Sequence, residues 1–302
     1  MTTISAALPR VVADSLCTYG LDPLEVALLA RDALAEDLAL GPDVTTAATV
    51  TAEATSIGDV SCRTSGVLAG VDVAASVLHV LAQDTGASVR VDVLRRDGGR
   101  LLPGEVVLTV AGPTRTLLTA ERTMLNLVCH LSGVATLTAQ WVDAVRGTGA
   151  AVRDTRKTTP RLRRLEKHAV RCGGGFNHRM ALGDAALIKD NHVAAAGGVA
   201  AALHAVRRHA PDVPVEVECD TLEQVRQAVG AGATLVLLDN MTLEQMGSAV
   251  AYARPFGVRL EASGGLTLDS AAAVAATGVD FLAVGAVTHS ATVLDLGFDL
   301  RC

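Results

Sequence analysis

Short apolar runs alternate with helical segments through the second half of the chain, and this alternation restricts the fold more than any other feature. Runs rich in Val, Leu and Ile predict strands at residues 150–153, 185–189, 215–218, 234–239, 258–262 and 280–284. Helices are expected between them. Strands that alternate with helices are typical of βα units around a parallel sheet. We therefore predict an α/β barrel in this half.

Three of the expected helices begin in the same way. The sequences that start at Thr221, Thr242 and Thr267 each place a threonine before Leu and an acidic residue. A threonine can cap a helix N-terminus, and the first two sequences also fit the capping box. The recurring strand–turn–helix module is a weak internal repeat, as expected of a barrel.

The first 130 or so residues lack this repeat. A helix is predicted over residues 22–38, with Asp22 as its cap and Pro23 in its first turn. Strands are expected at 56–62 and 101–110, and a helix at 115–145 joins the two parts. We predict an α+β domain over residues 1–132 and a barrel domain over residues 133–302.

Each apolar run of the second half ends at a polar or glycine-rich point. These strand ends carry Asp154, Arg156, Lys157, Lys189, Asp190, Glu218, Asp239, Asn240, Glu261, Ser263 and Gly285. The carboxyl ends of barrel strands converge on one face, where chemistry is usually found. A polar residue at one strand end is usually only the start of a loop, whereas six such ends with both signs of charge indicate a convergent site.

Two small-residue segments are candidates for phosphate binding. Ser263-Gly264-Gly265 follows a strand and precedes the helix expected at Thr267, where free backbone N–H groups favour an anion. Gly285 follows the last strand, and loops after the final two strands of such barrels often hold phosphate. The chain has neither a Walker A sequence nor a G-x-G-x-x-G motif.

Positive charge is concentrated in one window. Residues 153–179 hold nine Lys and Arg and two acids, a net charge of +7 in a chain whose total is −6. Arg161, Arg163, Arg164 and Lys167 fit a solvated helix face. Arg156 and Lys157 follow a strand, His178 and Arg179 follow a triple glycine, and Lys189 ends an apolar strand. These groups predict a pocket for an anionic substrate.

Glu218 and Asp239 would oppose this positive charge at two strand ends. Carboxylates there could bind sugar hydroxyls or hold Mg²⁺ beside a phosphate, or they could only balance the charge. His168, His192 and His289 lack metal-ligand spacing, so packing or supporting roles are favoured for them.

Several classes of protein are disfavoured. The chain has seven aromatic residues and a net negative charge, which argues against a nucleic-acid platform. The six cysteines are widely spaced, which suggests reduced thiols rather than zinc ligands. No apolar run reaches the length of a membrane span and the N-terminus does not resemble a signal peptide, so a soluble cytoplasmic protein is expected.

A set of motifs in order resembles one known family. They are Glu121–Asn126 with Ser132–Thr136, Asp154–Thr158, Gly173–Arg179, Leu187–His192, Val217–Glu218, Leu238–Asn240, Glu261–Gly265 and Ala283–Ala286. Together they are similar to the quinolinate phosphoribosyltransferase family, also called nicotinate-nucleotide pyrophosphorylase (carboxylating). The resemblance runs from about Asp22 to Gly297. The combination of D-T-R-K-T, H-R and L-I-K-D-N-H is highly specific.

The resemblance implies a type II phosphoribosyltransferase fold, in which an N-terminal α/β sandwich precedes an incomplete α/β barrel. It implies that quinolinate and phosphoribosyl pyrophosphate yield nicotinate mononucleotide, pyrophosphate and CO₂, with Mg²⁺, in de novo NAD biosynthesis. It also implies a homodimer or hexamer in which Arg122 reaches the neighbouring subunit's site.

The resemblance also implies residue roles. Quinolinate carboxylates would be held by Arg122, Arg156, His178, Arg179 and Lys189. Lys157 and Lys189 would neutralise phosphate, and the backbone at Thr155 would contact substrate. Glu218 and Asp239 would bind the ribose hydroxyls directly or through Mg²⁺. The 5′-phosphate would lie in the cradle formed by Ser263, Gly264 and Gly265 with Val284, Gly285 and Ala286.

Departures from the family pattern are small. Ala181 stands where the family usually has glycine, and the segment before Asp22 looks like an N-terminal extension. The nearest alternatives are paralogues of the same fold, either a molybdenum-transport-associated protein or a nicotinate phosphoribosyltransferase. The full set of carboxylate-binding positions favours quinolinate.

Overall fold

The computed structural model describes residues 8–301 and divides into two compact units. Of the described residues, the first unit contains those up to 137 together with 164–173 and 291–301, and the second contains 138–163 and 174–290. The change of unit after residue 137 lies shortly beyond the predicted boundary at 132/133. Two later segments return to the first unit. Among the described residues, no helix is both long and apolar enough to span a bilayer.

The first unit combines helices with a mainly antiparallel arrangement of strands. Its elements are α1 (Arg10–Thr18), α2 (Pro23–Asp37), α3 (Val44–Thr49), β1 (Thr55–Cys62), β2 (Gly66–Val67), α4 (Val71–Thr85), β3 (Arg90–Val93), β4 (Arg100–Leu101), β5 (Val106–Pro113), most of α5 (Thr114–Ala144), most of α6 (Arg163–Cys172) and β12 (Leu296–Leu300). Asp22 caps α2 by accepting a hydrogen bond from the Leu24 N–H at 2.8 Å, as predicted.

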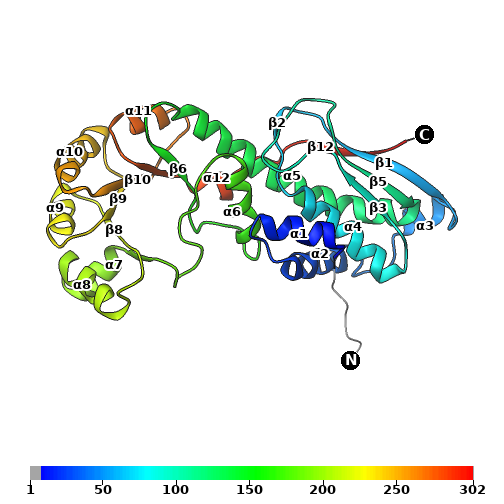
Figure 1. The fold of residues 1–302 in the computed structure, drawn as a ribbon, viewed down its shortest axis with the longest axis horizontal. Helices are drawn as coiled ribbons and strands as arrows, with labels where there is room; N and C mark the ends of the chain where they lie inside the picture. Colours follow the sequence, from blue (N-terminus) through cyan, green and yellow to red (C-terminus); the bar gives the residue numbers. More distant parts are fainter. Residues whose placement is uncertain (1–7, 302) are drawn as a thin grey trace. The chain divides into compact units, whose positions relative to one another are not determined.

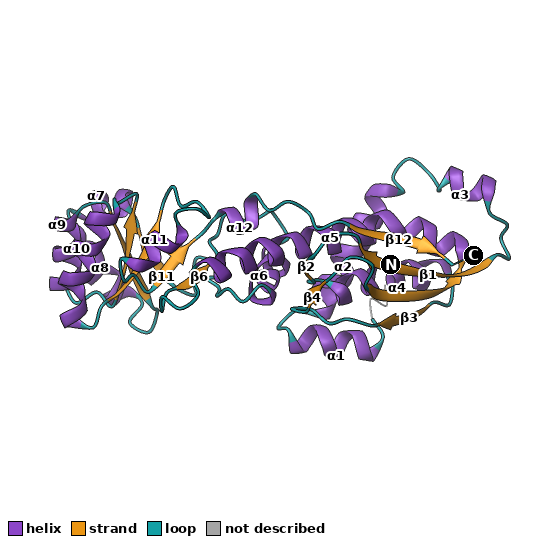
Figure 2. Cartoon of the chain, turned by 90° about the horizontal axis from the view of Figure 1, so that it is seen from above, coloured by secondary structure: helices purple, strands orange, loops and turns teal. Residues whose placement is uncertain are grey.

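Four strands of this unit form a sheet in the order β12-β1-β5-β3, and α4 lies along it (Figure 2). The C-terminal strand β12 pairs antiparallel with β1, with Val60 opposite Phe298. Gly58 makes this pairing possible, because a Cβ there would lie 2.3 Å from the Phe298 ring. The predicted strand at 101–110 is divided into β4 and β5, which lie in different sheets.

Helix α6 buries three consecutive ionisable residues, Glu166, Lys167 and His168. The expected solvated face is therefore wrong for Lys167, whose side chain is fully buried. Glu166 Oε1 lies 2.8 Å from His130 Nε2 on α5. Buried ionisable groups are tolerated where they are paired, so a charge-rich sequence need not mark an exposed face.

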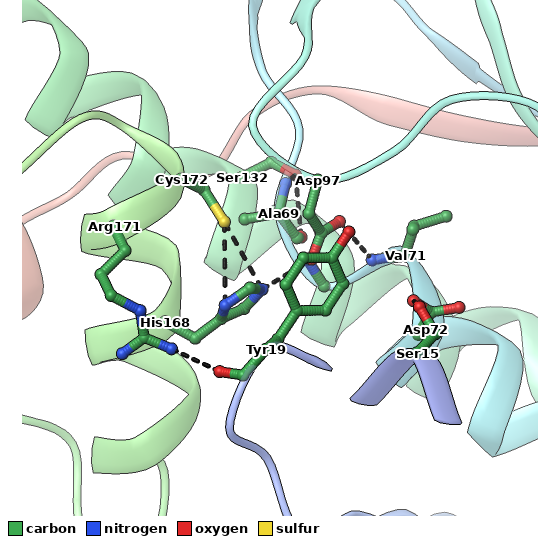
Figure 3. A network of polar contacts seen from close by, with 11 residues as sticks. Ser15, Tyr19, Ala69, Val71, Asp72, Asp97, Ser132, His168, Arg171 and Cys172 are labelled. Carbon is green, nitrogen blue, oxygen red and sulfur yellow. Dashed lines mark hydrogen bonds and ion pairs between the residues drawn. The ribbon is translucent and has the colours of Figure 1, made fainter. Parts of the chain in front are cut away.

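Asp97 is the centre of a polar network in the first unit (Figure 3). Its carboxylate accepts hydrogen bonds from Gly70 N–H at 2.8 Å and Val71 N–H at 3.0 Å, where α4 begins, and lies 2.7 Å from His168 Nε2. Cys172 Sγ lies 3.4 Å from the same nitrogen. Burial raises the pKa of Cys172 to about 12, so this thiol is not an activated nucleophile. The network joins α6 to the start of α4.

The second unit contains the predicted βα repeat. Its elements are β6 (Ala151–Arg153), β7 (Ala186–Ile188), α7 (Asp190–Ala196), α8 (Val199–His209), β8 (Val215–Cys219), α9 (Leu222–Gly230), β9 (Leu235–Asp239), α10 (Leu243–Ala253), the 3₁₀ turn η1 (Arg254–Phe256), β10 (Arg259–Ser263), α11 (Ala271–Ala276), β11 (Phe281–Ala283) and α12 (Ala286–His289). All six strands expected from the apolar runs are present.

These six strands form one parallel sheet in the order β6-β11-β10-β9-β8-β7. Helices α8 to α10 cover its outer side (Figure 1). Strands β6 and β7 are the two edges of the sheet, so the barrel is incomplete, as predicted. The carboxyl ends of all six strands face the same way, which places the residues that follow them at one rim.

Two of the three predicted threonine caps are present. Thr221 and Thr242 form complete capping boxes with Gln224 and Gln245. Thr267 does not begin a helix, because α11 starts only at Ala271 and residues 267–270 form a turn in which Thr267 Oγ1 accepts a hydrogen bond from the Ser270 N–H. The Ser263-Gly264-Gly265 segment therefore precedes a turn rather than a helix N-terminus.

Candidate active site

A cavity of about 530 Å³ opens at the carboxyl ends of the parallel strands. It is lined by Thr155, Arg156, Lys157, His178, Arg179, Leu187, Lys189, Glu218, Leu237, Asp239, Asn240, Ser263, Gly264, Gly265 and Ala283. A second cavity of about 190 Å³ shares Thr155, Lys157 and residues 263–265 with it and adds Leu266, Val284, Gly285, Ala286 and His289. All of these residues belong to the second unit.

The structure thus brings together all of the predicted site residues except one. Arg122 belongs to α5 in the first unit, where its side chain is 67% exposed and its guanidinium lies 3.9 Å from Glu121 Oε1. Arg122 does not line the cavities of the second unit.

Lys189 and Glu218 form an ion pair inside the larger cavity. Lys189 Nζ lies 2.5 Å from Glu218 Oε2. Lys189 directly follows β7, and Glu218 lies on the neighbouring strand β8. Lys189 also precedes α7, where its N–H donates to His192 Nδ1 at 2.9 Å. His192 therefore fixes the backbone next to Lys189, which agrees with the supporting role favoured for it.

Two arginines of the cavity lie close together. Burial and the neighbouring Arg156 lower the pKa of Arg179, which reflects the electrostatic cost of gathering cations without an anion. Arg179 Nη1 donates to Ala185 O at 3.0 Å. Arg156 Nε is buried and has no hydrogen-bond partner among the described residues. An unpaired buried guanidinium N–H beside a second arginine fits an anionic ligand.

Asp154 fixes the loop that carries His178. It is completely buried and accepts hydrogen bonds from His178 N–H at 2.8 Å and from Asn177 Nδ2 at 2.6 Å. The sequence presented Asp154 only as one of several polar strand ends. Its burial shows that it holds the backbone of the site rather than facing a substrate.

The turn at Gly264 depends on glycine. Its φ is +84°, and a Cβ there would lie 2.3 Å from Asn240 Oδ1. Asn240 itself has a positive φ of 53°, donates its N–H to Ser263 O at 3.0 Å and donates from Nδ2 to Asp239 Oδ2 at 2.8 Å. These two turns bring the Ser263 backbone at the end of β10 close to the Asp239 carboxylate at the end of β9. Both residues line the cavity.

The smaller cavity has the small-residue lining expected of a phosphate cradle. A Cβ at Gly285 would lie 3.0 Å from Lys157 Cδ, so glycine allows the Lys157 side chain to cross the loop. Thr288 Oγ1 donates to Lys157 O at 2.9 Å and fixes this lysine's backbone.

Several lining residues were not predicted as site residues. Asn240 was identified only as a strand end, and a packing or supporting role was favoured for His289. Leu187 and Ala283 appeared only as the first residues of two motifs, and Leu237 and Leu266 were not singled out. His289 Nδ1 lies 2.7 Å from Ser290 Oγ, and the histidine lines the smaller cavity. Asn240 could have been predicted as a site residue from its position directly after Asp239. Leu187, Leu237 and Ala283 are ordinary strand residues and Leu266 is a loop residue, so their apolar side chains did not mark them as site residues.

An incomplete α/β barrel whose strand ends gather cations, two carboxylates and a glycine-rich cradle defines an enzyme for phosphorylated, anionic substrates. Comparisons with known proteins agree. The family models for the N-terminal and C-terminal domains of quinolinate phosphoribosyl transferase match residues 43–132 and 134–299. The chain belongs to the quinolinate phosphoribosyltransferase family.

Its relatives match over nearly their whole length. The chain is 56% identical to nicotinate-nucleotide pyrophosphorylase [carboxylating] of Mycobacterium leprae over 272 residues, which cover 89% of this chain and 95% of that protein. It is 38% identical to the Homo sapiens protein of the same name over 285 residues, 93% of each. The crystal structure of NadC from Streptococcus pyogenes matches with a TM-score of 0.86 and 38% identity over 93% of this chain and 97% of that one.

Human nicotinic acid phosphoribosyltransferase matches with a TM-score of 0.61 at 15% identity, over 86% of this chain and 72% of that one. That likeness shows a shared fold alone. The fold alone therefore does not distinguish an enzyme for quinolinate from an enzyme for nicotinate. The Mycobacterium leprae and Homo sapiens relatives, in contrast, are both named as carboxylating pyrophosphorylases.

Proposed function

We propose that this enzyme converts quinolinate and phosphoribosyl pyrophosphate into nicotinate mononucleotide, pyrophosphate and CO₂, a step of de novo NAD biosynthesis. The observation that carries the proposal is the convergence of Arg156, Lys157, Arg179 and Lys189 on one cavity. A dicarboxylate and a sugar polyphosphate need this density of positive charge. Membership of the family selects quinolinate as the dicarboxylate.

The quinolinate carboxylates would bind to the arginine side of the cavity. Arg156 and Arg179 would grip them through guanidinium N–H groups, and the buried Arg156 Nε would gain the partner that it lacks. His178 lines the same wall and Lys189 would supply a point charge. The N–H donors of the Thr155 loop would complete the contact.

Phosphoribosyl pyrophosphate would extend from the carboxylates Glu218 and Asp239 to the smaller cavity. The backbone of residues 263–265 and 284–286 would hold its 5′-phosphate, with Lys157 between the two cavities. Glu218 and Asp239 would contact the ribose hydroxyls. The pyrophosphate would be neutralised by Lys157 and Lys189.

Glu218 and Asp239 are also the residues that would hold Mg²⁺. They lie on the neighbouring strands β8 and β9, both line the cavity, and carboxylate oxygens are the ligands that this ion prefers. When bound, Mg²⁺ would neutralise charge on the pyrophosphate.

The chemistry asks the protein mainly for position and charge. The bond between ribose C1 and pyrophosphate breaks, its electrons leave with pyrophosphate, and the sugar becomes positively charged. Glu218 and Asp239 would stabilise this charge. The pyridine nitrogen then forms its bond to C1. Loss of CO₂ leaves an electron pair on the ring carbon next to the positive nitrogen, and a proton from water takes the place of CO₂.

Turnover on the two rival substrates tests the proposal. We expect pyrophosphate release, and CO₂ release from carboxyl-labelled quinolinate, when quinolinate and phosphoribosyl pyrophosphate are supplied together. Chelation of divalent cations should abolish the reaction and added Mg²⁺ should restore it. Activity on nicotinate with none on quinolinate would overturn the assignment.

The functional unit would be a homodimer or a hexamer in the cytoplasm. Arg122 supports an oligomer, because its exposed guanidinium is available to the cavity of a neighbouring subunit. Five described cysteines, at positions 17, 62, 129, 172 and 219, are free thiols, which suits a reducing compartment.

A further inference from the structure

A buried layer of ionisable groups lies beneath the cavity rim, at strand positions two residues before those at the rim. Side chains at alternate positions of a strand share a face, so Glu216 lies below Glu218 on β8, and Glu261 lies below Ser263 on β10. Glu216 is 4% exposed and Glu261 is fully buried. Neither glutamate lines the two cavities at the rim, so neither contacts the proposed substrates directly.

His178 connects this layer to the cavity. Its Nδ1 accepts a hydrogen bond from the Arg179 N–H at 2.7 Å, so the ring proton lies on Nε2. Nε2 lies 2.7 Å from Glu216 Oε2 and 3.6 Å from Glu261 Oε1. This arrangement is that of a neutral imidazole that donates to Glu216.

Two acceptors in the layer have no donor. Glu216 Oε1 and Glu261 Oε1 are buried and have no hydrogen-bond partner among the described residues. One carboxylate oxygen from each glutamate and a ring nitrogen of His178 lie within 4.8 Å of one another. The second oxygen of Glu261 is paired with Arg153 Nη1 on β6. A proton on Glu261 Oε1 would turn one of these two orphaned acceptors into a donor for a carboxylate oxygen of Glu216 in the same cluster.

The balance of charge in the buried layer also favours a proton on one of the two glutamates. Within the layer itself, two ionised glutamates and the neutral His178 would face only the positive charge of Arg153, while Arg179 at the rim above also acts on Glu216. One added proton makes the layer neutral, which is the cheaper state in a buried environment. In the two strands that pair with β10, the register partners of Glu261 are the apolar Leu237 on β9 and Phe281 on β11. The nearest ionisable residues on the same face are Asp239, two positions along β9, and Arg259, two positions along β10.

We infer that Glu261 is a neutral carboxylic acid and that Glu261 and Glu216 together form a positioning pair, which fixes the tautomer and orientation of His178 in the quinolinate pocket. The assignment of a quinolinate pocket rests on the proposed function. Glu216 is held in place by the Glu261 hydroxyl, His178 is held by Glu216, and the Arg179 backbone is held by His178.

The protonated state has a consequence for stability. Burial, and then the neighbouring Glu216, raise the pKa of Glu261 from 4.5 to about 7. The folded chain therefore keeps a proton that the unfolded chain loses, so this group's contribution to stability falls as pH rises from 4.5 to about 7. Glutamine at this position would mimic the neutral acid and remove that dependence.

Infrared spectroscopy and thermal unfolding of the unliganded full chain test the protonation. Wild type should show the C=O band of a protonated carboxyl group that disappears with a midpoint near pH 7, which is the pKa in question. Glu261→Gln should lack this band and should have the higher Tm at alkaline pH. Glu244→Gln, a control at an exposed position of α10, should keep both wild-type properties. Wild type without the band, or Glu261→Gln with it, would overturn the inference.

Kinetics and NMR test the positioning. Glu216→Ala should raise the KM for quinolinate roughly ten- to hundredfold, with little change in the KM for phosphoribosyl pyrophosphate. Glu216→Gln keeps an acceptor for His178 and should restore most of the loss. An unchanged quinolinate KM, or equal effects on both substrates, would contradict the positioning role.

Nitrogen-15 NMR of wild type adds a test that does not depend on a truncated variant folding, with the His178 signal assigned by its loss in His178→Gln. The expected signal is that of a neutral ring protonated at Nε2, and a charged or Nδ1-protonated ring would contradict the inference. The spectroscopic tests need no substrate. A wild-type enzyme that fails to turn over quinolinate would therefore overturn the proposed function and leave these results intact.

Discussion

Lys189 Nζ lies 2.5 Å from Glu218 Oε2, and this pair joins the cationic and the anionic side of the cavity. Lys189 is about half exposed while Glu218 is 11% exposed, so the lysine can leave the carboxylate more easily than the carboxylate can move. A substrate carboxylate or phosphate can therefore compete for Lys189 and release Glu218 toward the sugar.

Lys189→Ala should lower kcat/KM for quinolinate by roughly a hundredfold, because it removes a cation from the substrate and leaves Glu218 without its counter-ion. Steady-state kinetics check the loss, and circular dichroism checks that the fold is kept. Arg208→Ala removes an exposed cation from α8 and serves as the control. Near-normal turnover by Lys189→Ala would refute its role.

Gly264→Ala should weaken phosphoribosyl pyrophosphate binding. The left-handed backbone costs alanine roughly 1–2 kcal/mol, and the new Cβ would lie 2.3 Å from Asn240 Oδ1. Gly147→Ala is a matched control, because Gly147 has a φ of +83° and a Cβ added there would have no atom within 4 Å. Thermal unfolding should show the backbone cost in both variants, while only Gly264→Ala should raise the KM. Equal KM values would contradict the cradle.

Arg122→Ala should lose activity alone and recover part of it in mixed oligomers with Glu218→Ala. If Arg122 serves the neighbouring subunit, a mixed dimer contains one site with both defects and one with neither. Co-refolding of differently tagged chains and assay of the purified mixture measure the recovery. Mixtures that stay as inactive as the two parents would show that each site uses its own Arg122.

Asp97→Asn should destabilise the first unit by roughly 1–3 kcal/mol. The carboxylate accepts from two backbone N–H groups at the start of α4 and pairs with His168, and an amide can satisfy these donors only in part. Urea unfolding measures the change, with Asp212→Asn at an exposed position as the control. An unaltered midpoint would mean that the network contributes no net stability.

The barrel and most of the site could be predicted because both follow from local patterns. Parallel strands buried on both faces give apolar runs, and the residue after each run then lies at the shared rim. Glu218, Asp239 and Lys189 were identified in this way. Arg122 was assigned to the site by resemblance only, since nothing local distinguishes it on α5.

Other features could not be predicted because they depend on distant contacts. Strand β12 pairs with β1 from the opposite end of the chain, and Lys167 is buried although lysine normally marks the surface. Glu216 was not identified for a related reason, and Glu261 was identified only as a polar strand end and not as a buried group. From the sequence alone, an isolated acidic residue inside an apolar run could lie at a buried strand position beneath the cavity or in an exposed loop.

The pairing of β12 with β1 also affects the order in which the chain can fold during synthesis. The ribosome releases β1 long before β12, because translation adds only about 5–20 residues per second. Until β12 emerges, β1 remains an unprotected edge strand, the kind of surface that favours aggregation. A variant that lacks β12 would keep that edge exposed permanently, so deletion of residues 296–300 should promote aggregation although the barrel and its site are left intact.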